Sequence, residues 1–472
     1  MLETPLLYQR ISSIIEKQIK SGVLKMGDRL PSLRTVCTNH GVSMTTALES
    51  YHHLEKKGFI EARPQSGFYV AYAVRNFPGL HDTTTPRTTA GIENVEHLIA
   101  TVRQNQHKMV TSFASGMPSI DLLPVAKLNK ALVEAMRSLP ESGIAYDYAG
   151  NARLKGQIAR RALAWNGSLH HDEIITTSGC MEALSHCLIS LTKRGDTIAV
   201  ESPVFFGILQ LATNLGLNVL ELPTNTVTGI ELDALKAALL KKKLKLCLLI
   251  PNFSNPIGSC MPDEHKKEVV RLLEHYNVPL IEDDIYGDLY YGTQRPSTCK
   301  SYDQSGIVLY CSSFSKTLAP GYRVGWVAPG KYKALLERTK SYHSISSNTL
   351  AHEAIAYFLE NNRYDNHLRK LRLALHTSSL QYLRSISEYF PDGTKVSRPE
   401  GGFVLWVALP KKTDAVRLYD LAILQKINIS PGQMFTLKKQ YTNCFRLSTG
   451  MNWSSKVEGA LKQLGRIAKS LC

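Results

Sequence analysis

The chemistry of this sequence is concentrated in residues 312–326, where Lys316 stands among hydroxyl-bearing and small side chains directly after an apolar run. A lysine amine can form a Schiff base with an aldehyde, while hydroxyls and a guanidinium can hold a phosphate dianion. Ser313 and Ser315 supply the hydroxyls, and Arg323, seven positions after the lysine, supplies the guanidinium. These residue types at this spacing suit a carbonyl cofactor that carries a phosphate.

Residues 312–326 resemble the lysine motif of the fold-type I aminotransferases, which bind pyridoxal 5'-phosphate (PLP). The resemblance implies that Lys316 forms the Schiff base with PLP, and that the two serines and Arg323 hold the phosphate. Four further motifs occur in the order this family requires, at residues 177–184, 201–207, 251–258 and 281–287. The resemblance extends over residues 110–470, and it implies the fold and the active-site residues of that family.

The first of these motifs, residues 177–184, follows a β-branched run and opens a helical pattern. The backbone N–H groups of Gly179, Cys180 and Met181 could therefore cradle a phosphate at the positive end of a helix dipole. Such turns are common in α/β folds, so this motif supports the interpretation only together with the others.

The other motifs supply side chains for the cofactor ring. By resemblance, Phe205 would stack on the pyridine, although a phenylalanine of the core is an alternative. Asn255 and Tyr286 would hydrogen-bond the ring oxygen. Asp283 ends a predicted strand, where ligands of open α/β sheets collect, and would keep the pyridine nitrogen protonated so that the ring withdraws electrons. The neighbouring acids, Glu282 and Asp284, are expected to be structural.

Three more residues complete the expected site by resemblance. Arg446 matches the arginine that grips the α-carboxylate of an amino acid through a bidentate fork. Gly116 lies in the segment that lines the substrate side. Tyr146 matches the tyrosine that reaches the phosphate of the partner subunit, so a homodimer is expected.

Residues 1–72 show three helical patterns followed by two short β-branched runs. The first pattern stops at Gly22, the second begins at Pro31 and closes at Gly41, and Ser43 is a good N-cap for the third. The residues expected in the core of this segment are Ile11, Ile14, Ile15, Ile19, Leu33, Val36, Cys37, Ala47, Tyr51 and Leu54. Two helices joined by a tight glycine turn are typical of a helix-turn-helix, and residues 64–66 between the two runs predict a wing.

This segment resembles the GntR family of bacterial regulators in four motifs, at residues 30–34, 41–46, 54–58 and 66–70. The resemblance implies a winged helix-turn-helix that binds double-stranded DNA. The expected DNA contacts are Arg34, Ser43, Thr45, Thr46 and the wing around Gly67. Met44 and Leu48 stand where many relatives carry arginine, so base readout at those two positions should be weaker or different.

The chain as a whole predicts an α/β protein with three parts. Residues 1–72 form the winged helix-turn-helix, residues 73–109 a linker and a leading helix, and residues 110–472 the PLP-binding domain. In the last part, short β-branched runs alternate with amphipathic stretches, which indicates a mainly parallel central sheet covered by helices. A smaller C-terminal subdomain is expected from the family.

Composition excludes several classes of protein. The longest apolar run falls short of a membrane span, and the first ten residues do not form a secretory signal. Nine scattered cysteines without a C-x-x-C pair indicate neither a disulfide framework nor a metal site, so a cytoplasmic location is expected. The net charge is +16, but residues 1–72 hold only nine Lys and Arg against six Asp and Glu. Net charge therefore does not locate a DNA-binding surface.

The two halves together resemble the MocR subfamily of GntR regulators. The resemblance implies a PLP-dependent DNA-binding transcription regulator whose large domain senses PLP, an amino compound, or both. The alternative is an active PLP-dependent aminotransferase with an accessory DNA-binding domain. A third hypothesis, a DNA-binding protein whose large domain only dimerises, conflicts with so complete a cofactor site.

Overall fold

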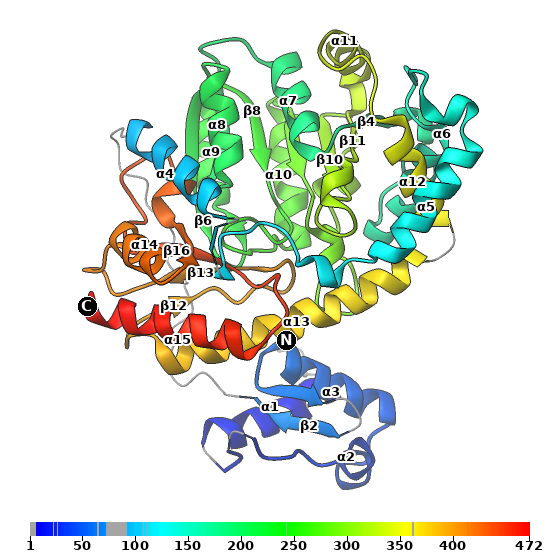
Figure 1. The fold of residues 1–472 in the computed structure, drawn as a ribbon. Helices are drawn as coiled ribbons and strands as arrows, with labels where there is room; N and C mark the ends of the chain where they lie inside the picture. Colours follow the sequence, from blue (N-terminus) through cyan, green and yellow to red (C-terminus); the bar gives the residue numbers. More distant parts are fainter. Residues whose placement is uncertain are drawn as a thin grey trace.

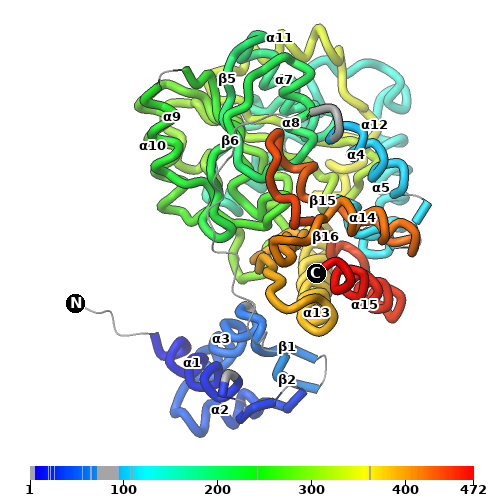
Figure 2. Tube along the Cα trace, turned by 90° about the vertical axis from the view of Figure 1, so that its left-hand side faces the viewer, coloured from blue at the N-terminus to red at the C-terminus, as the bar shows by residue number. Residues whose placement is uncertain are grey.

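The structure is a computed structural model that describes residues 6–21, 23–25, 27–63, 66–71, 92–106, 108–109, 111–241, 243–360 and 363–472. The predicted linker, residues 73–91, and part of the predicted wing turn lie outside these ranges. A small N-terminal domain and a large domain are separate in space, and the small one lies beneath helix α13 of the large one (Figures 1 and 2).

The N-terminal domain has the predicted order of elements. These are α1 (Leu7–Lys20), α2 (Leu33–His40), α3 (Met44–Lys56), β1 (Ile60–Arg63) and β2 (Gly67–Val70). Ser43 caps α3 by accepting a hydrogen bond from the Thr46 amide at 3.1 Å, and Gly41 ends α2 in the left-handed conformation. Ile11, Ile15 and Ile19 are buried as predicted, but Ile14 is 40% exposed, so the prediction that it belongs to the core is wrong.

A central eight-stranded sheet organises the large domain, in the strand order β4-β11-β10-β9-β8-β5-β6-β7. The strands are β4 (Ile175–Thr177), β5 (Thr197–Ser202), β6 (Asn218–Asn225), β7 (Gly229–Ile230), β8 (Leu244–Leu249), β9 (Leu280–Asp283), β10 (Val308–Ser313) and β11 (Gly325–Ala328). Neighbours from β10 through β6 run parallel, whereas β11 and β7 are antiparallel to their partners. The predicted mainly parallel sheet is confirmed.

Both faces of the sheet are covered by helices. Along β8, Leu246 and Leu248 pack in one apolar cluster and Cys247 and Leu249 in another, which explains why the strand reads as an unbroken apolar run. The first cluster includes side chains of α7 (Cys180–Leu191), α8 (Phe206–Asn214) and α11 (Lys333–His343), and the second those of α9 (Leu232–Leu240) and α10 (Asp263–His275). A third cluster joins the sheet edge to α5 (Val125–Ser138), α6 (Ala152–Arg161) and α12 (Thr349–Glu360).

A smaller C-terminal subdomain is present, as expected. Its sheet has the order β12-β13-β16-β15, with β12 (Lys395–Val396), β13 (Val404–Ala408), β15 (Ser430–Pro431) and β16 (Cys444–Ser448). Its helices are α14 (Ala415–Leu424), α15 (Ser455–Ser470) and much of the long α13 (Arg363–Tyr389). The leading helix α4 (Ile92–Asn105) packs here too, and β3 (Thr111–Ser112) pairs with β14 (Ile427–Asn428). That pairing brings residues 113–116 beside the subdomain.

None of the described helices combines the length and apolar character that crossing a lipid bilayer requires.

Candidate cofactor site and DNA-contacting face

Lys316 lies in the turn that follows β10, at the carboxyl edge of the parallel strands. Its Nζ donates a hydrogen bond to the backbone oxygen of Gly116 at 2.6 Å. Burial, together with the nearby positive charge of Arg446, lowers the pKa of Lys316 to about 8. The amine can therefore lose its proton close to neutral pH, as a nucleophilic lysine must.

A second buried cation, Arg446, comes from β16 of the small subdomain and is 2% exposed. It donates to the side-chain oxygen of Asn255 at 3.1 Å, to the backbone oxygen of Ala114 at 2.6 Å and to Ser430 Oγ at 3.2 Å. Its Nε is buried without a hydrogen-bond partner among the described residues, and burial lowers the pKa of Arg446 to about 10. A carboxylate could replace the neutral oxygens to which this guanidinium donates, because a charged acceptor binds a guanidinium more strongly.

Asn255 and Tyr286 form one connected group with Arg446. Asn255 accepts from Arg446 and donates from Nδ2 to the Tyr286 hydroxyl at 3.3 Å. Tyr286 is 3% exposed, and its ring centroid lies 6.0 Å from Lys316 Nζ. Burial raises the pKa of Tyr286, so the phenol keeps its proton and remains a hydrogen-bond donor at physiological pH.

Asp283 is the last residue of β9 and is 5% exposed. Its Oδ1 accepts from the Cys180 thiol at 3.3 Å and from the Ile285 amide at 3.2 Å. Burial raises the pKa of Asp283 to about 6. A cation placed against this carboxylate would be stabilised by it and would lower the pKa again.

The turn before α7, residues 178–181, and the Lys316 loop, residues 313–323, are joined by hydrogen bonds, and we call these two segments together the cup. Arg323, in the left-handed conformation, donates to Ser315 Oγ at 3.2 Å and to the backbone oxygen of Ser178 at 3.1 Å. Gly179 has φ +93°, a conformation that residues with a Cβ rarely adopt, so this turn favours glycine, and a Cβ there would also displace the Arg323 guanidinium. Cys180 and Met181 begin α7, and the first amides of a helix have no carbonyl partner within the helix. Ser313 closes the loop by accepting from the Ser315 amide at 3.3 Å.

Two residues beside this cup were missed by the sequence interpretation. Gly325 packs against the turn at Gly179, and a Cβ on it would lie 2.6 Å from the carbonyl carbon of Gly179 and 2.9 Å from the Cys180 amide nitrogen. Glu182 accepts from the Ser178 amide at 2.7 Å and holds the start of the turn. Gly325 could have been found, because it directly follows Arg323 and Val324 in the sequence of the lysine motif. Nothing in the local sequence distinguishes Glu182.

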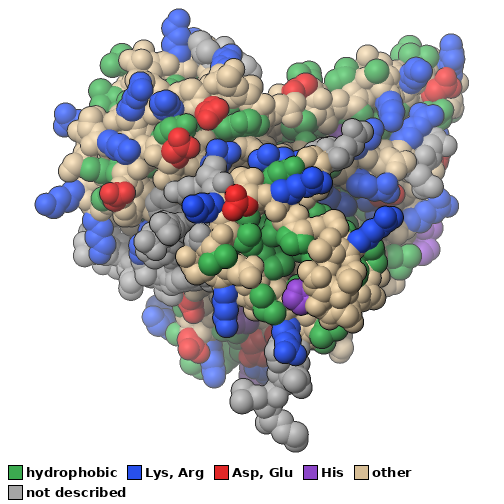
Figure 3. Space-filling view, turned by 90° about the horizontal axis from the view of Figure 1, so that it is seen from below, with side chains coloured by type: hydrophobic (Ala, Val, Ile, Leu, Met, Phe, Trp, Pro, Cys, Tyr) green, Lys and Arg blue, Asp and Glu red, His purple; other side chains and the backbone are tan. Residues whose placement is uncertain are grey.

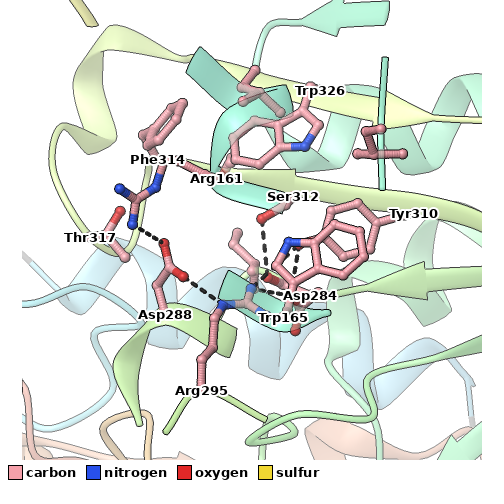
Figure 4. A pocket seen from close by; sticks show the side chains of 14 residues that line it. Arg161, Trp165, Asp284, Asp288, Arg295, Tyr310, Ser312, Phe314, Thr317 and Trp326 are labelled. Carbon is pink, nitrogen blue, oxygen red and sulfur yellow. Dashed lines mark hydrogen bonds and ion pairs between the residues drawn. The ribbon is translucent and has the colours of Figure 1, made fainter. Parts of the chain in front are cut away.

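The acids that flank Asp283 are bound to protein groups. Glu282 accepts from the Cys299 and Lys300 amides at 2.7 and 2.8 Å, and Asp284 pairs with Arg295 at 2.6 Å. Arg295 also pairs with Asp288 at 2.7 Å, and Figure 4 shows it between the two carboxylates, in a pocket beside the Lys316 loop. Burial alone would raise the pKa of the Asp288 carboxyl. The positive charges of Arg295 and Arg161 outweigh this effect and lower the pKa to about 2.

Two predicted cofactor residues form no described contact with the Lys316 group. Phe205 precedes α8 at the same carboxyl edge of the sheet, is half-buried and lies 4.8 Å from the Phe206 ring. Tyr146 is 67% exposed on a loop and lies 5.6 Å from the Tyr148 ring. The roles of both residues stay predictions.

The predicted DNA contacts lie on exposed parts of the N-terminal domain. Arg34, Ser43 and Thr45 are exposed, Thr46 is partly buried by its bond to Ser43, and Gly67 begins β2 with φ +105°. Arg29, which the sequence interpretation missed, lies against Gly67: a Cβ there would be 3.7 Å from its guanidinium. Seen from below, Lys and Arg side chains are spread over the molecule rather than gathered in one patch (Figure 3).

Comparison with known proteins gives two family matches. Residues 108–463 match "Aminotransferase class I and II", and residues 7–70 match "Bacterial regulatory proteins, gntR family". The chain is 36% identical to the uncharacterized HTH-type transcriptional regulator YdcR of Escherichia coli (strain K12), over 98% of each chain. It is 26% identical to the HTH-type transcriptional regulator NorG of Staphylococcus aureus (strain USA300), over 94% of this chain and all of NorG. The crystal structure of a multiple substrate aminotransferase from Thermococcus profundus superposes with a TM-score of 0.74 at 25% identity, over 80% of this chain and 95% of that one.

Replacing Gly325 by alanine tests the cup. The added methyl must push the backbone of the turn at Gly179, and overpacking of this kind costs about 1–3 kcal/mol. We expect affinity for PLP, the cofactor expected from the sequence, to fall about tenfold to a hundredfold in a fluorescence titration. Gly321→Ala in the same loop is the control, because a Cβ there meets nothing within 4 Å. Equal affinities for the two variants would contradict this account.

Removing Arg295 tests the ion-pair network. The Arg295→Met variant leaves Asp284, which is 1% exposed, as a buried carboxylate without its cation. We expect the free energy of unfolding of the large domain to fall by about 3–5 kcal/mol in denaturant titrations followed by circular dichroism. Arg271→Met removes an exposed pair with Glu268 and should have little effect. A variant as stable as the wild type would show that the network does not stabilise the fold.

Proposed function

Because the chain belongs to the class I and II aminotransferase family and carries a gntR-family domain in the arrangement of the MocR regulators, we propose that it is a PLP-dependent transcription regulator. One observation carries the proposal. The groups expected to hold the cofactor and an exposed helix-turn-helix face occur in the same chain. A metabolic enzyme has no need of the second feature.

The site fits PLP in three physical respects. The Lys316 amine is able to shed its proton near neutral pH, the cup at Gly179 is lined by a guanidinium and helix-terminal amides, and Asp283 offers a buried carboxylate. When bound, PLP supplies an aldehyde that condenses with amines and a pyridine ring that withdraws electrons. Lys316 would hold the aldehyde carbon, and Ser313, Ser315 and Arg323 would hold the phosphate.

The remaining groups would orient the ring and an amino compound. Asp283 would keep a proton on the pyridine nitrogen, with the Cys180 thiol orienting its carboxylate. Asn255 and Tyr286 would donate to the ring oxygen. Arg446 would grip a carboxylate of the amino compound and release Asn255 or Ala114 as it does so. Gly116 would be displaced from the Lys316 amine when that amine reacts.

We propose that two copies of the chain form a homodimer through the segment around Tyr146. Ile144, Tyr146 and Tyr148 are 86%, 67% and 70% exposed, which is a costly arrangement for apolar side chains in water. Tyr146 would then reach the phosphate held by the other copy. Sedimentation at micromolar concentration tests this part of the proposal, and a monomer would reject it.

The alternative function is amino-group transfer, and the intact site favours keeping it as a candidate. Amino-group transfer would use Lys316, Asp283, Asn255, Tyr286 and Arg446, and the hydrogen bonds of these residues support this alternative. Steady turnover of an amino acid with a keto acid at about 1–10³ per second would favour an enzyme, and slow or stoichiometric conversion would favour a sensor.

Lys316→Ala tests the cofactor attachment. The wild type saturated with PLP should absorb at the wavelength of a lysine-bound cofactor, and the variant should lose this band because it has no amine to bond. DNA affinity measured with and without PLP should also lose its difference in the variant. Lys236→Ala, an exposed lysine of α9, is the control and should behave as the wild type does. An unchanged spectrum in Lys316→Ala would reject the assignment.

Arg34→Ala tests the DNA face. Neutralising one phosphate contact should weaken binding to specific and random duplexes alike, and should reduce the slope of log affinity against log salt by about 0.9. Lys57→Ala is the control, because Lys57 lies beyond the other end of α3 and pairs with Glu16 at 3.0 Å. A salt slope that is the same in Arg34→Ala and in the wild type would remove Arg34 from the contacts.

A further inference from the structure

Three side chains that can bind a metal gather on a surface turn before β4, outside the residues assigned to the cofactor site. Among the residues that the structure describes, His170, His171 and Asp172 form the one group of three histidines, cysteines or acids whose ligand atoms all lie within 4.8 Å of one another. Imidazole nitrogens and a carboxylate oxygen are ligands that zinc and neighbouring divalent transition ions take in proteins. The turn therefore offers a ligand set of the kind that binds such an ion.

The carboxylate of Asp172 lies close to both imidazoles. Its Oδ2 is 3.3 Å from Nδ1 of His170, and its Oδ1 is 3.5 Å from Nε2 of His171. The two ring centroids are 4.1 Å apart. In a tetrahedral zinc site with bonds of about 2.0–2.1 Å, neighbouring ligand atoms are separated by about 3.3–3.4 Å. The two nitrogen–oxygen distances match this separation, and all three side chains are exposed, so small rotations bring them onto one ion.

The backbone that carries these ligands is fixed by the fold. The Glu173 side chain accepts from the His170 amide at 2.6 Å, which caps the short helix η4 (His171–Glu173). On either side of the turn, Leu169 and the fully buried Ile174 pack in the apolar cluster that joins α5, α6 and α12 to the sheet edge. Ligands held on a fixed backbone lose less conformational entropy when they bind. The turn is therefore preorganised for binding.

Nδ1 of His170 has two competing partners in the absence of an ion. The Asp172 amide donates to it at 3.4 Å, and Oδ2 of the same residue lies 3.3 Å away. A ring nitrogen that accepts a hydrogen bond has no proton to give to a carboxylate, so it cannot serve both partners at once. A cation between the nitrogen and the carboxylate binds the electron pairs of both, in exchange for one long amide bond.

We infer that His170, His171 and Asp172 form a surface site for a divalent transition ion of the zinc class. The inference goes beyond the proposed function and does not rest on it. Three protein ligands leave one position of a tetrahedral ion open to water or to a group on another molecule. Mg²⁺ and Ca²⁺ take ligand sets made of oxygen, so they should not compete for this site.

Calorimetric titration of the full-length, metal-free protein with ZnCl₂ tests the site. We expect the wild type to bind one equivalent, and His170→Ala and Asp172→Asn each to weaken its affinity at least about tenfold, because even the loss of a group that only supports a ligand costs about 10–100-fold in metal affinity. Both variants keep the bond from the His170 backbone amide to Glu173, so the turn is retained. Excess Mg²⁺ should leave the titration unchanged.

Two exposed residues provide controls for binding elsewhere on the chain. His275→Ala removes an exposed histidine at the end of α10, and Cys472→Ser removes an exposed thiol. Both variants should bind zinc as the wild type does. If the wild type binds no zinc, if His170→Ala and Asp172→Asn bind it as the wild type does, or if Cys472→Ser is the variant that loses the equivalent, the inference is overturned.

A second measurement needs no variant. Diethyl pyrocarbonate modifies exposed imidazoles, and mass spectrometry measures the label on each histidine. His170, His171 and His275 are all exposed and should react in the metal-free protein. Saturating Zn²⁺ should protect the first two, because the ion holds the electron pair that reacts, and should leave His275 as reactive as before. Equal labelling of His170 and His171 with and without Zn²⁺ would contradict the inference.

Discussion

Two cations in one buried site set the main physical constraint on the large domain. The Lys316 amine and the Arg446 guanidinium are both desolvated, and burial lowers the pKa of each. Backbone oxygens of Gly116 and Ala114 and the amide of Asn255 stabilise these cations without cancelling their charge. The site therefore keeps a positive field, and a ligand that carries phosphate and carboxylate groups complements it.

This constraint explains why distant segments must meet. Arg446 comes from the small subdomain, Lys316 from the large sheet, and Ala114 from the segment that β3 pairs with β14. Lys316 and Arg446 both donate to this segment, at Gly116 and Ala114, so a ligand that displaces either bond also affects the segment that links them. Such a site suits a sensor as well as a catalyst, and the fused DNA-contacting domain is what favours the sensor.

Much of the fold follows from local pattern. The strands around Lys316 and Asp283 are short β-branched runs, and Gly41 and Ser43 mark the turn and the cap of the N-terminal helices. Ile14 has the spacing of a core residue but is exposed. The rest of the small domain covers only part of the apolar face of α1. The bond of Cys180 to Asp283 and the packing of Gly325 on the turn join residues far apart in sequence. Only the tertiary structure brings such pairs together, so these contacts could not be predicted, although Gly325 itself is visible in the sequence of the Lys316 loop.

The cup near Arg323 is built largely of main chain, since Gly179 and Gly325 bring backbone against backbone and α7 offers its free amides. Apart from these two glycines, Arg323 and the nearby serines, few positions offer a side chain whose substitution would alter this surface. The segment that ends at Gly116, in contrast, reaches the lysine from outside the sheet and is attached through the pairing of β3 with β14. Exchange of residues near Gly116 can thus reshape the space next to the lysine during evolution, while the main chain around Arg323 is inherited unchanged.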